Sequence, residues 1–143
     1  MLCGLPALLS ADTIIIKNAY AYRATPSSKA GGIFMMIHNH GIADDRLVSV
    51  ASTAARKAEL HNHVESANGV MKMRPVLDGF AIGAGKMAML KRGADHIMLM
   101  GLRSSWHQGD LISIVLTFEK AGEMTLDVPV DLNRADAAHS HEK

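Results

Sequence analysis

Residues that favour turns recur throughout this chain, with short apolar or alternating runs between them. The breaks contain Pro26-Ser27-Ser28, Asn39-His40-Gly41, Asn68-Gly69, Asp78-Gly79, Gly83-Ala84-Gly85, Arg92-Gly93 and Gln108-Gly109. Strands separated by such close turns pair antiparallel, because parallel strands need a crossover of about a dozen or more residues. The spacing therefore predicts an all-β fold, an antiparallel β-sandwich or barrel.

The runs between these turns predict nine strands. They are residues 13–24, 33–40, 46–51, 58–65, 70–74, 86–91, 96–102, 111–119 and 123–130. Alternation is clearest in 111–118, where Ile112, Ile114, Leu116 and Phe118 share one face, which we expect in the core. Residues 51–60 contain a cluster of alanines and favour a helical turn or short helix, or equally a loop leading into the following strand.

A chain of 143 residues is long enough for one domain with a sizeable core. We expect that domain at residues 12–131. Residues 1–11 are almost wholly apolar and end in Ser10-Ala11, which is typical of the end of a secretory signal; an ordinary N-terminal extension or a buried strand is the alternative. Residues 132–143 are polar and predict a flexible tail that carries His139 and His141.

Charge and cysteine content exclude several classes of protein. The formal net charge is +1, from 15 basic and 14 acidic residues, so no preference for nucleic acid or an anionic membrane follows. Cys3 is the only cysteine, which excludes an internal disulfide and any centre with several cysteines. A blue-copper electron-transfer site needs a cysteine thiolate beside two histidines, and no cysteine follows position 3.

The unusual residues are ten methionines and eight histidines. His96 and Met98 are two residues apart on a predicted strand, so their side chains project from the same face. His61-Asn62-His63 and Met71-Lys72-Met73 repeat this spacing. Imidazole and thioether form a soft, uncharged donor set that suits Cu(I) better than calcium, magnesium or zinc. These residues give copper binding as a working hypothesis, and methionines that fill gaps in the core stay open as the alternative.

Two other groups of soft donors have open interpretations. Met87 and Met89 lie on a predicted strand without a histidine partner, which favours core packing. His38, His40, Met35 and Met36 could form a second, weak metal site, or simply a hydrated strand end.

Three segments carry a resemblance to a known family. They are Leu60-His61, the run from Gly69 to Val76, and the run from His96 to Leu102, with weaker similarity elsewhere between about Asn18 and Val130. Together they resemble the periplasmic copper chaperone family of PCu(A)C type. The resemblance implies a cupredoxin-like β-sandwich that carries Cu(I) in the bacterial periplasm and delivers it for cytochrome oxidase assembly. Its expected partner is a copper-accepting protein, such as an oxidase subunit or another copper chaperone.

The resemblance also implies the ligands His61, Met73, His96 and Met98. Compared with the usual spacing in that family, this chain has one extra residue between His61 and Met73 and another between Met73 and His96. The choice between Met71 and Met73 therefore stays open. The tail histidines His139 and His141 would add a Cu(II) position. None of this requires chemistry on a substrate, so we expect a protein that is not an enzyme.

Two alternatives differ in class. A zinc or copper hydrolase or oxidase would need mostly nitrogen or oxygen ligands and an activated water, and we expect no carboxylate at a ligand spacing beside these donors. No Gly-x-Ser-x-Gly elbow or phosphate loop is present in the sequence. The remaining alternative is a β-sandwich interaction module with a methionine-rich core and no metal role.

Overall fold

Ten β-strands run through the residues that the computed structural model describes, which are 13–23, 25, 27–65, 71–75, 78–91 and 94–132, with the backbone alone for 63–65 and 71–75. The strands are β1 (Ile14–Tyr22), β2 (Ala30–Asn39), β3 (Asp45–Ala51), β4 (Ala55–Glu65), β5 (Met71–Pro75), β6 (Phe80–Ile82), β7 (Met87–Leu90), β8 (His96–Leu102), β9 (Leu111–Phe118) and β10 (Gly122–Pro129). Each of the nine predicted strands overlaps one of these, whereas the three residues of β6 were too short to be predicted.

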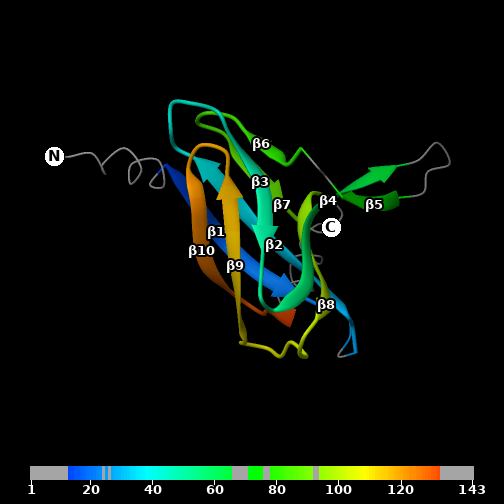
Figure 1. The fold of residues 1–143 in the computed structure, drawn as a ribbon. Coiled ribbons are helices and arrows are strands. Elements are labelled where there is room, and N and C mark those ends of the chain that lie inside the picture. Colours follow the sequence, from blue (N-terminus) through cyan, green and yellow to red (C-terminus); the bar gives the residue numbers. More distant parts are fainter. Residues whose placement is uncertain are drawn as a thin grey trace, which may run out of the picture.

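The strands form two sheets that pack face to face (Figure 1). The large sheet has the order β1-β2-β8-β4-β5, with β7 also paired to β2; the small sheet has the order β10-β9-β3-β6. Every pairing within the sheets is antiparallel, and one isolated parallel bridge joins Ala21 to Val130. The predicted antiparallel β-sandwich is therefore confirmed.

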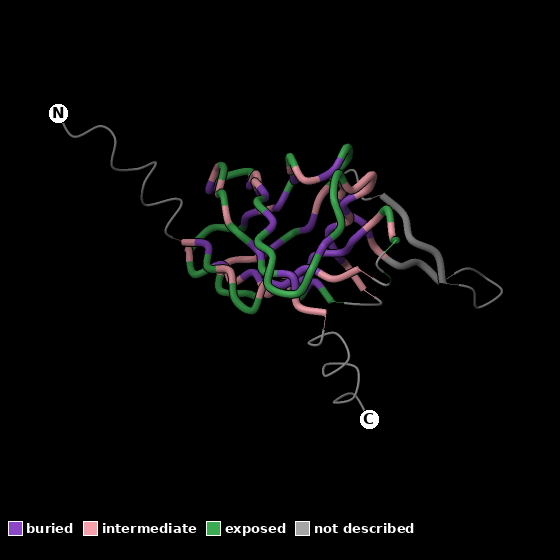
Figure 2. The backbone as a smooth tube through the Cα atoms, turned by 90° about the horizontal axis from the view of Figure 1, so that it is seen from below, coloured by how far each residue is buried: buried purple, intermediate pink, exposed green. Residues whose placement is uncertain are grey.

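The core lies between the two sheets and follows the alternation of the strands. From β9 it takes the predicted face, Ile112, Ile114, Leu116 and Phe118, all of which are buried. The large sheet contributes Ile33 and Ile37 from β2 and Ile97 and Leu99 from β8. Buried stretches consequently run through the middle of the molecule, and exposed ones lie on its outer loops (Figure 2). Removing this apolar surface from water is the main stabilising contribution.

Trp106 closes the core at the end where β8 leads towards β9. Its side chain is fully buried and packs against Gly31, where an added Cβ would collide with the indole ring. The carbonyl of Trp106 accepts a hydrogen bond of 2.6 Å from Nε of Arg23. A glycine at position 31 is therefore required by the close approach of this ring rather than by backbone conformation.

The short helix expected in residues 51–60 is not formed, and the alternative, a loop leading into the next strand, is confined to residues 52–54. β3 continues to Ala51, a turn follows, and β4 begins at Ala55. Ala55 pairs with Leu102 and Ala58 with Leu99 of β8, and both alanines pack against the core. Pairing with a neighbouring strand thus overrides the helix propensity of alanine, which is the highest of any residue.

Candidate metal centre

β4 and β8 bring two histidines together on the outer face of the large sheet. Their antiparallel register places His61 opposite His96 and Glu59 opposite Met98. Leu60 and Ile97, next to the histidines, are buried in the core, so these four residues lie on the face that points away from the small sheet. The ring centroids of His61 and His96 are 5.8 Å apart, and the rings are inclined by 63°. Three of the four expected ligands are therefore neighbours in the fold.

His96 is held in one orientation by the turn that precedes β8. Its side chain is almost completely buried, with 3% of the residue exposed. Nδ1 lies 2.9 Å from the carbonyl oxygen of Ala94, and because a carbonyl only accepts, Nδ1 carries the proton. In this tautomer the lone pair is on Nε2, the arrangement that backbone carbonyls commonly impose on histidines that bind metals.

His61 is equally well buried, with 7% exposed, and it contacts a carboxylate. Its Nε2 lies 2.8 Å from Oε1 of Glu59, so Nε2–H donates and Nδ1 carries the lone pair. Nδ1 is buried and has no hydrogen-bond partner among the described residues. Leaving such an atom unsatisfied costs about 1–3 kcal/mol, and this is the nitrogen that a metal ion would use.

Glu59 is the residue of this group that the sequence interpretation missed, and the expectation that no carboxylate would lie beside the donors is wrong. The hydrogen bond from His61, assisted by the charge of Lys57 at 3.6 Å, holds the pKa of the Glu59 carboxyl below its usual value. The signal was available in the spacing Glu59-x-His61, because residues two apart on a strand share a face.

An aromatic row borders the histidines on the side of β2. The ring of Phe34 lies 6.0 Å from that of His96, and Tyr20 on β1 lies 5.2 Å beyond Phe34. Phe34 is buried and covers Gly32, the register partner of Met98, where an added Cβ would come within 2.9 Å of the phenyl ring. This wall keeps water from one side of the group, which favours uncharged ligands and an ion of low charge.

Met73 belongs to β5, at the edge of the large sheet next to β4. The register pairs its backbone with His63 and pairs Met71 with Glu65, while Pro75 faces His61. The side chains of residues 71–75 lie outside what the structure describes. The role expected for Met73 therefore stays a prediction.

No group of three or more histidine, cysteine, aspartate or glutamate side chains able to hold a metal ion occurs in the described part of the chain. A centre built there on nitrogen and oxygen alone, as zinc sites commonly are, is thus not formed. A metal bound between His61 and His96 would need thioether sulfur to complete its ligands, and half-buried Met98 provides one next to His96 on the same face.

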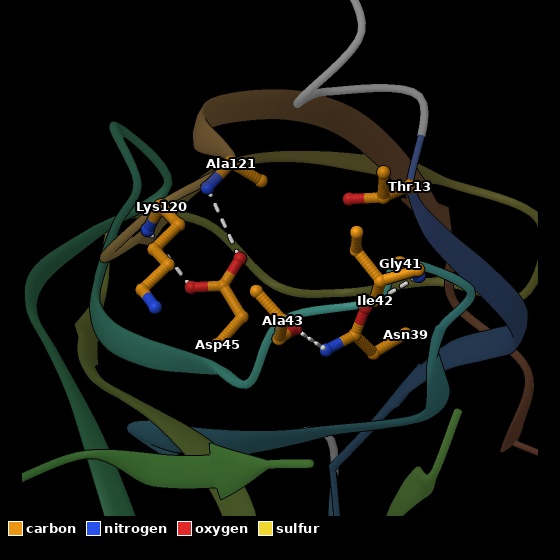
Figure 3. A pocket seen from close by; sticks show the side chains of 8 residues that line it. All are labelled: Thr13, Asn39, Gly41, Ile42, Ala43, Asp45, Lys120 and Ala121. Atoms are coloured by element: carbon orange, nitrogen blue, oxygen red, sulfur yellow. Dashed lines mark hydrogen bonds between the residues drawn. The ribbon is translucent and has the colours of Figure 1, made fainter. Parts of the chain in front are cut away.

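A cavity of about 200 Å³ lies elsewhere, where the connection from β2 to β3 meets the β9–β10 hairpin (Figure 3). The Asp45 carboxylate there accepts hydrogen bonds from the backbone amides of Lys120 and Ala121. Nδ2 of Asn39 donates to the carbonyls of Ala43 and Ile82. These polar groups hold the two connections together, which gives the cavity a structural interpretation.

Two solved structures share this fold. The "Copper-bound PCuAC domain from PmoF2" is 22% identical, with a TM-score of 0.69 over 84% of this chain and 93% of that chain. The "Solution structure of CuI-DR1885 from Deinococcus radiodurans" is 26% identical, with a TM-score of 0.63 over 83% and 78% of the two chains. The fold is therefore the cupredoxin-like β-sandwich of PCuAC domains, and the resemblance seen in the sequence is confirmed.

Sequence comparison places the chain within a family. Residues 14–130 match the family described as "Putative lipoprotein LpqE-like". "Putative lipoprotein Lxx21020" of Leifsonia xyli subsp. xyli is 33% identical over 120 residues, which are 84% of this chain and 70% of that protein. The chain belongs to the LpqE-like family. The described residues contain no helix long and apolar enough to cross a membrane.

Proposed function

We propose that this protein carries Cu(I) outside the cytoplasm, holding the ion with His61, Met73, His96 and Met98. The observation that carries the proposal is the direct opposition of His61 and His96 on β4 and β8, with Nδ1 of His61 buried and without a hydrogen-bond partner among the described residues. An unsatisfied lone pair beside a second oriented imidazole is an arrangement that a metal ion would relieve.

The chemistry of the donors selects the ion. Two neutral imidazoles and thioether sulfur leave the single charge of Cu(I) intact and disfavour Cu(II). The Glu59 carboxylate accepts a hydrogen bond from Nε2 of His61. It offsets the charge of the ion and makes Nδ1 of the ring a more basic ligand. Glu59 thus acts through His61 rather than as a ligand.

The register of β5 favours Met73 over Met71 as the fourth ligand. Met73 pairs with His63, two residues from His61 along β4, whereas Met71 pairs with Glu65, four residues away. Each two-residue step along a strand adds about 7 Å. Met71 would therefore start about 7 Å further from the two histidines.

Delivery follows from ligand exchange. Neutral ligands release a monovalent ion one bond at a time, and Met98 is only half-buried, so the ligands of an acceptor can approach. We propose transfer in the periplasm to a copper-accepting protein, either a cytochrome oxidase subunit during its assembly or another copper chaperone. The LpqE-like family and the Leifsonia relative are both described as lipoproteins, which supports a location outside the cytoplasm. The proposed role needs no reaction on a substrate.

We propose the same domain limits as the sequence predicted: a signal remnant at residues 1–11, the copper-binding domain at 12–131 and a tail at 132–143 whose His139 and His141 take Cu(II). The match of the family to residues 14–130 supports the middle part. The tail would load separately from the domain, because imidazoles without thioethers accept Cu(II).

Anaerobic titration with Cu(I) against a chromophoric competitor tests the proposal. We compare the parent with His96→Ala and Met98→Ala, with His107→Ala as the matched control, because His107 is exposed and lies 3.6 Å from Asp110. His96→Ala should bind Cu(I) at least about 100-fold more weakly and Met98→Ala at least about 10-fold more weakly, and the control should match the parent. Equal binding by parent and both ligand variants would show that the site is wrongly assigned. No binding by the parent would favour the interaction module.

A further inference from the structure

A second group of soft donors lies further along β2, on the same outer face. β7 pairs with β2 so that Met87 faces His38 and Met89 faces Met36. Their neighbours Ile37 and Leu90 are buried in the core, which places these four residues on the opposite side. Met35 points the other way and is buried, so it is not part of this group.

The expectation that Met87 and Met89 fill the core is wrong. They are 48% and 51% exposed, because Ala88 and Leu90 take the core-facing positions of β7. An exposed methionine beside a histidine has little packing to offer and leaves its sulfur accessible. The expectation that these methionines lack a histidine partner is also wrong, since His38 is the register partner of Met87.

His38 and His40 stack against each other at the end of β2. Their ring centroids are 3.9 Å apart and the planes are inclined by 43°. Within the described part of the chain neither ring forms a side-chain hydrogen bond, so their nitrogens are not committed to protein groups there. Partial burial, the neighbouring His40 and the charge of Lys17 lower the pKa of His38 below its usual value.

We propose that His38, His40 and Met87 form a second Cu(I) site. Residues that face each other across an antiparallel pair have Cβ atoms about 4.5–5.5 Å apart, which brings the Met87 thioether within reach of an ion on His38. Two imidazoles and one sulfur make a neutral, soft set of three donors, with Met36 and Met89 adjacent. Lys17, the partner of Met36 on β1, opposes a divalent ion more than a monovalent one.

This site is separate from the one between His61 and His96. Phe34, whose ring contacts His96, lies four residues before His38 on β2, a distance of about 13 Å along a strand. One ion cannot be shared over that span. The inference therefore stands or falls independently of the proposed function.

The test is an anaerobic Cu(I) titration of the full chain, followed by NMR of the histidine ring and methionine methyl signals. His139→Ala and His141→Ala are included in every sample, so that the tail does not compete. We expect the signals of His38, His40 and Met87 to shift as one group, separately from those of His61, His96 and Met98. Absence of any response at His38 and His40 up to millimolar Cu(I) would overturn the proposal.

Variants identify the donors. His38→Ala with His40→Ala should remove one equivalent of bound Cu(I) and leave the response of the His61 and His96 signals unchanged. Met87→Leu should weaken the second site at least about 10-fold, while Met89→Leu, a matched control of equal exposure, should change it less than about 3-fold. Equal effects of the two leucine variants would contradict the role of Met87.

Unchanged core methyl signals check that each variant is folded. A parent that responds at His38 but not at His61 would sustain this site and defeat the proposed function.

Discussion

The outer face of the large sheet carries two pairs of histidines that differ in how firmly they are held. His61 and His96 are buried, and each ring has a hydrogen bond that fixes its tautomer, to Glu59 and to the Ala94 carbonyl. His38 is half-buried, His40 is exposed, and they contact each other. Binding to a preorganised site requires less ordering of side chains, so the first pair should bind Cu(I) tightly and the second weakly. Burial and hydrogen bonding thus separate two sites of similar composition.

The largest difference should appear when one histidine of each pair is replaced by alanine and the two variants are compared. His96→Ala removes an oriented donor, and we expect the tighter Cu(I) affinity to fall at least about 100-fold. His40→Ala should alter that affinity less than about 2-fold while weakening the second site. Competition titration of both variants checks this, and a similar loss in the tighter constant for each would erase the distinction between the pairs.

Glu59 should matter for the first pair alone. Glu59→Gln keeps a hydrogen-bond acceptor for His61 but removes the negative charge, so Cu(I) affinity should drop about 10-fold to 100-fold there. Glu119→Gln changes an exposed carboxylate in the small sheet's turn and should have no effect. If the two glutamine variants bind alike in the competition assay, Glu59 does not act on His61.

Phe34 separates the two pairs along β2, and Phe34→Leu tests whether its ring serves only the first. The variant should lose about 1–2 kcal/mol of unfolding free energy, because the residue is buried against Tyr20 and over Gly32. Copper should also leave the first site several-fold faster in stopped-flow transfer to a chelator. If copper also left the second site equally faster, the Phe34 ring would not act on the His96 site alone.

The smallest effect concerns charge at the second pair. The positive charge of Lys17, which acts on His38, would repel a cation bound there, so Lys17→Gln should tighten Cu(I) at His38 and His40 by about 2-fold to 3-fold at low salt. The gain should shrink at high ionic strength, and the first site should not respond. Titration of the variant at two salt concentrations measures both changes; a gain that ignores salt would argue against an electrostatic cause.

Local patterns predicted much of this architecture. Turn spacing indicated an antiparallel sandwich or barrel, and alternation placed the face of Ile112 in the core. The common face of His96 and Met98 followed from two-residue spacing alone. These features depend on residues close together in the chain, which is why a sequence reveals them.

Contacts between distant segments could not be predicted in the same way. The opposition of His61 and His96 depends on which strand lies beside β8 and in what register, and alternation does not specify either. The same holds for β7 beside β2, which exposes Met87 and gives it His38 as a partner. Residue 31 must be glycine because its Cα lies against the ring of Trp106, which is far away in the sequence.

The short connection between β7 and β8 orients the His96 imidazole although it contains none of the proposed ligands. The amide of Ala94 donates to the Lys91 carbonyl, the amide of Lys91 donates to the Asp95 carbonyl, and the Ala94 carbonyl accepts a hydrogen bond from Nδ1 of His96. Lengthening this connection by one residue would displace that carbonyl and let the imidazole exchange its two protonation forms. For the proposed carrier, an insertion here would therefore change the rate of copper release without changing any donor atom.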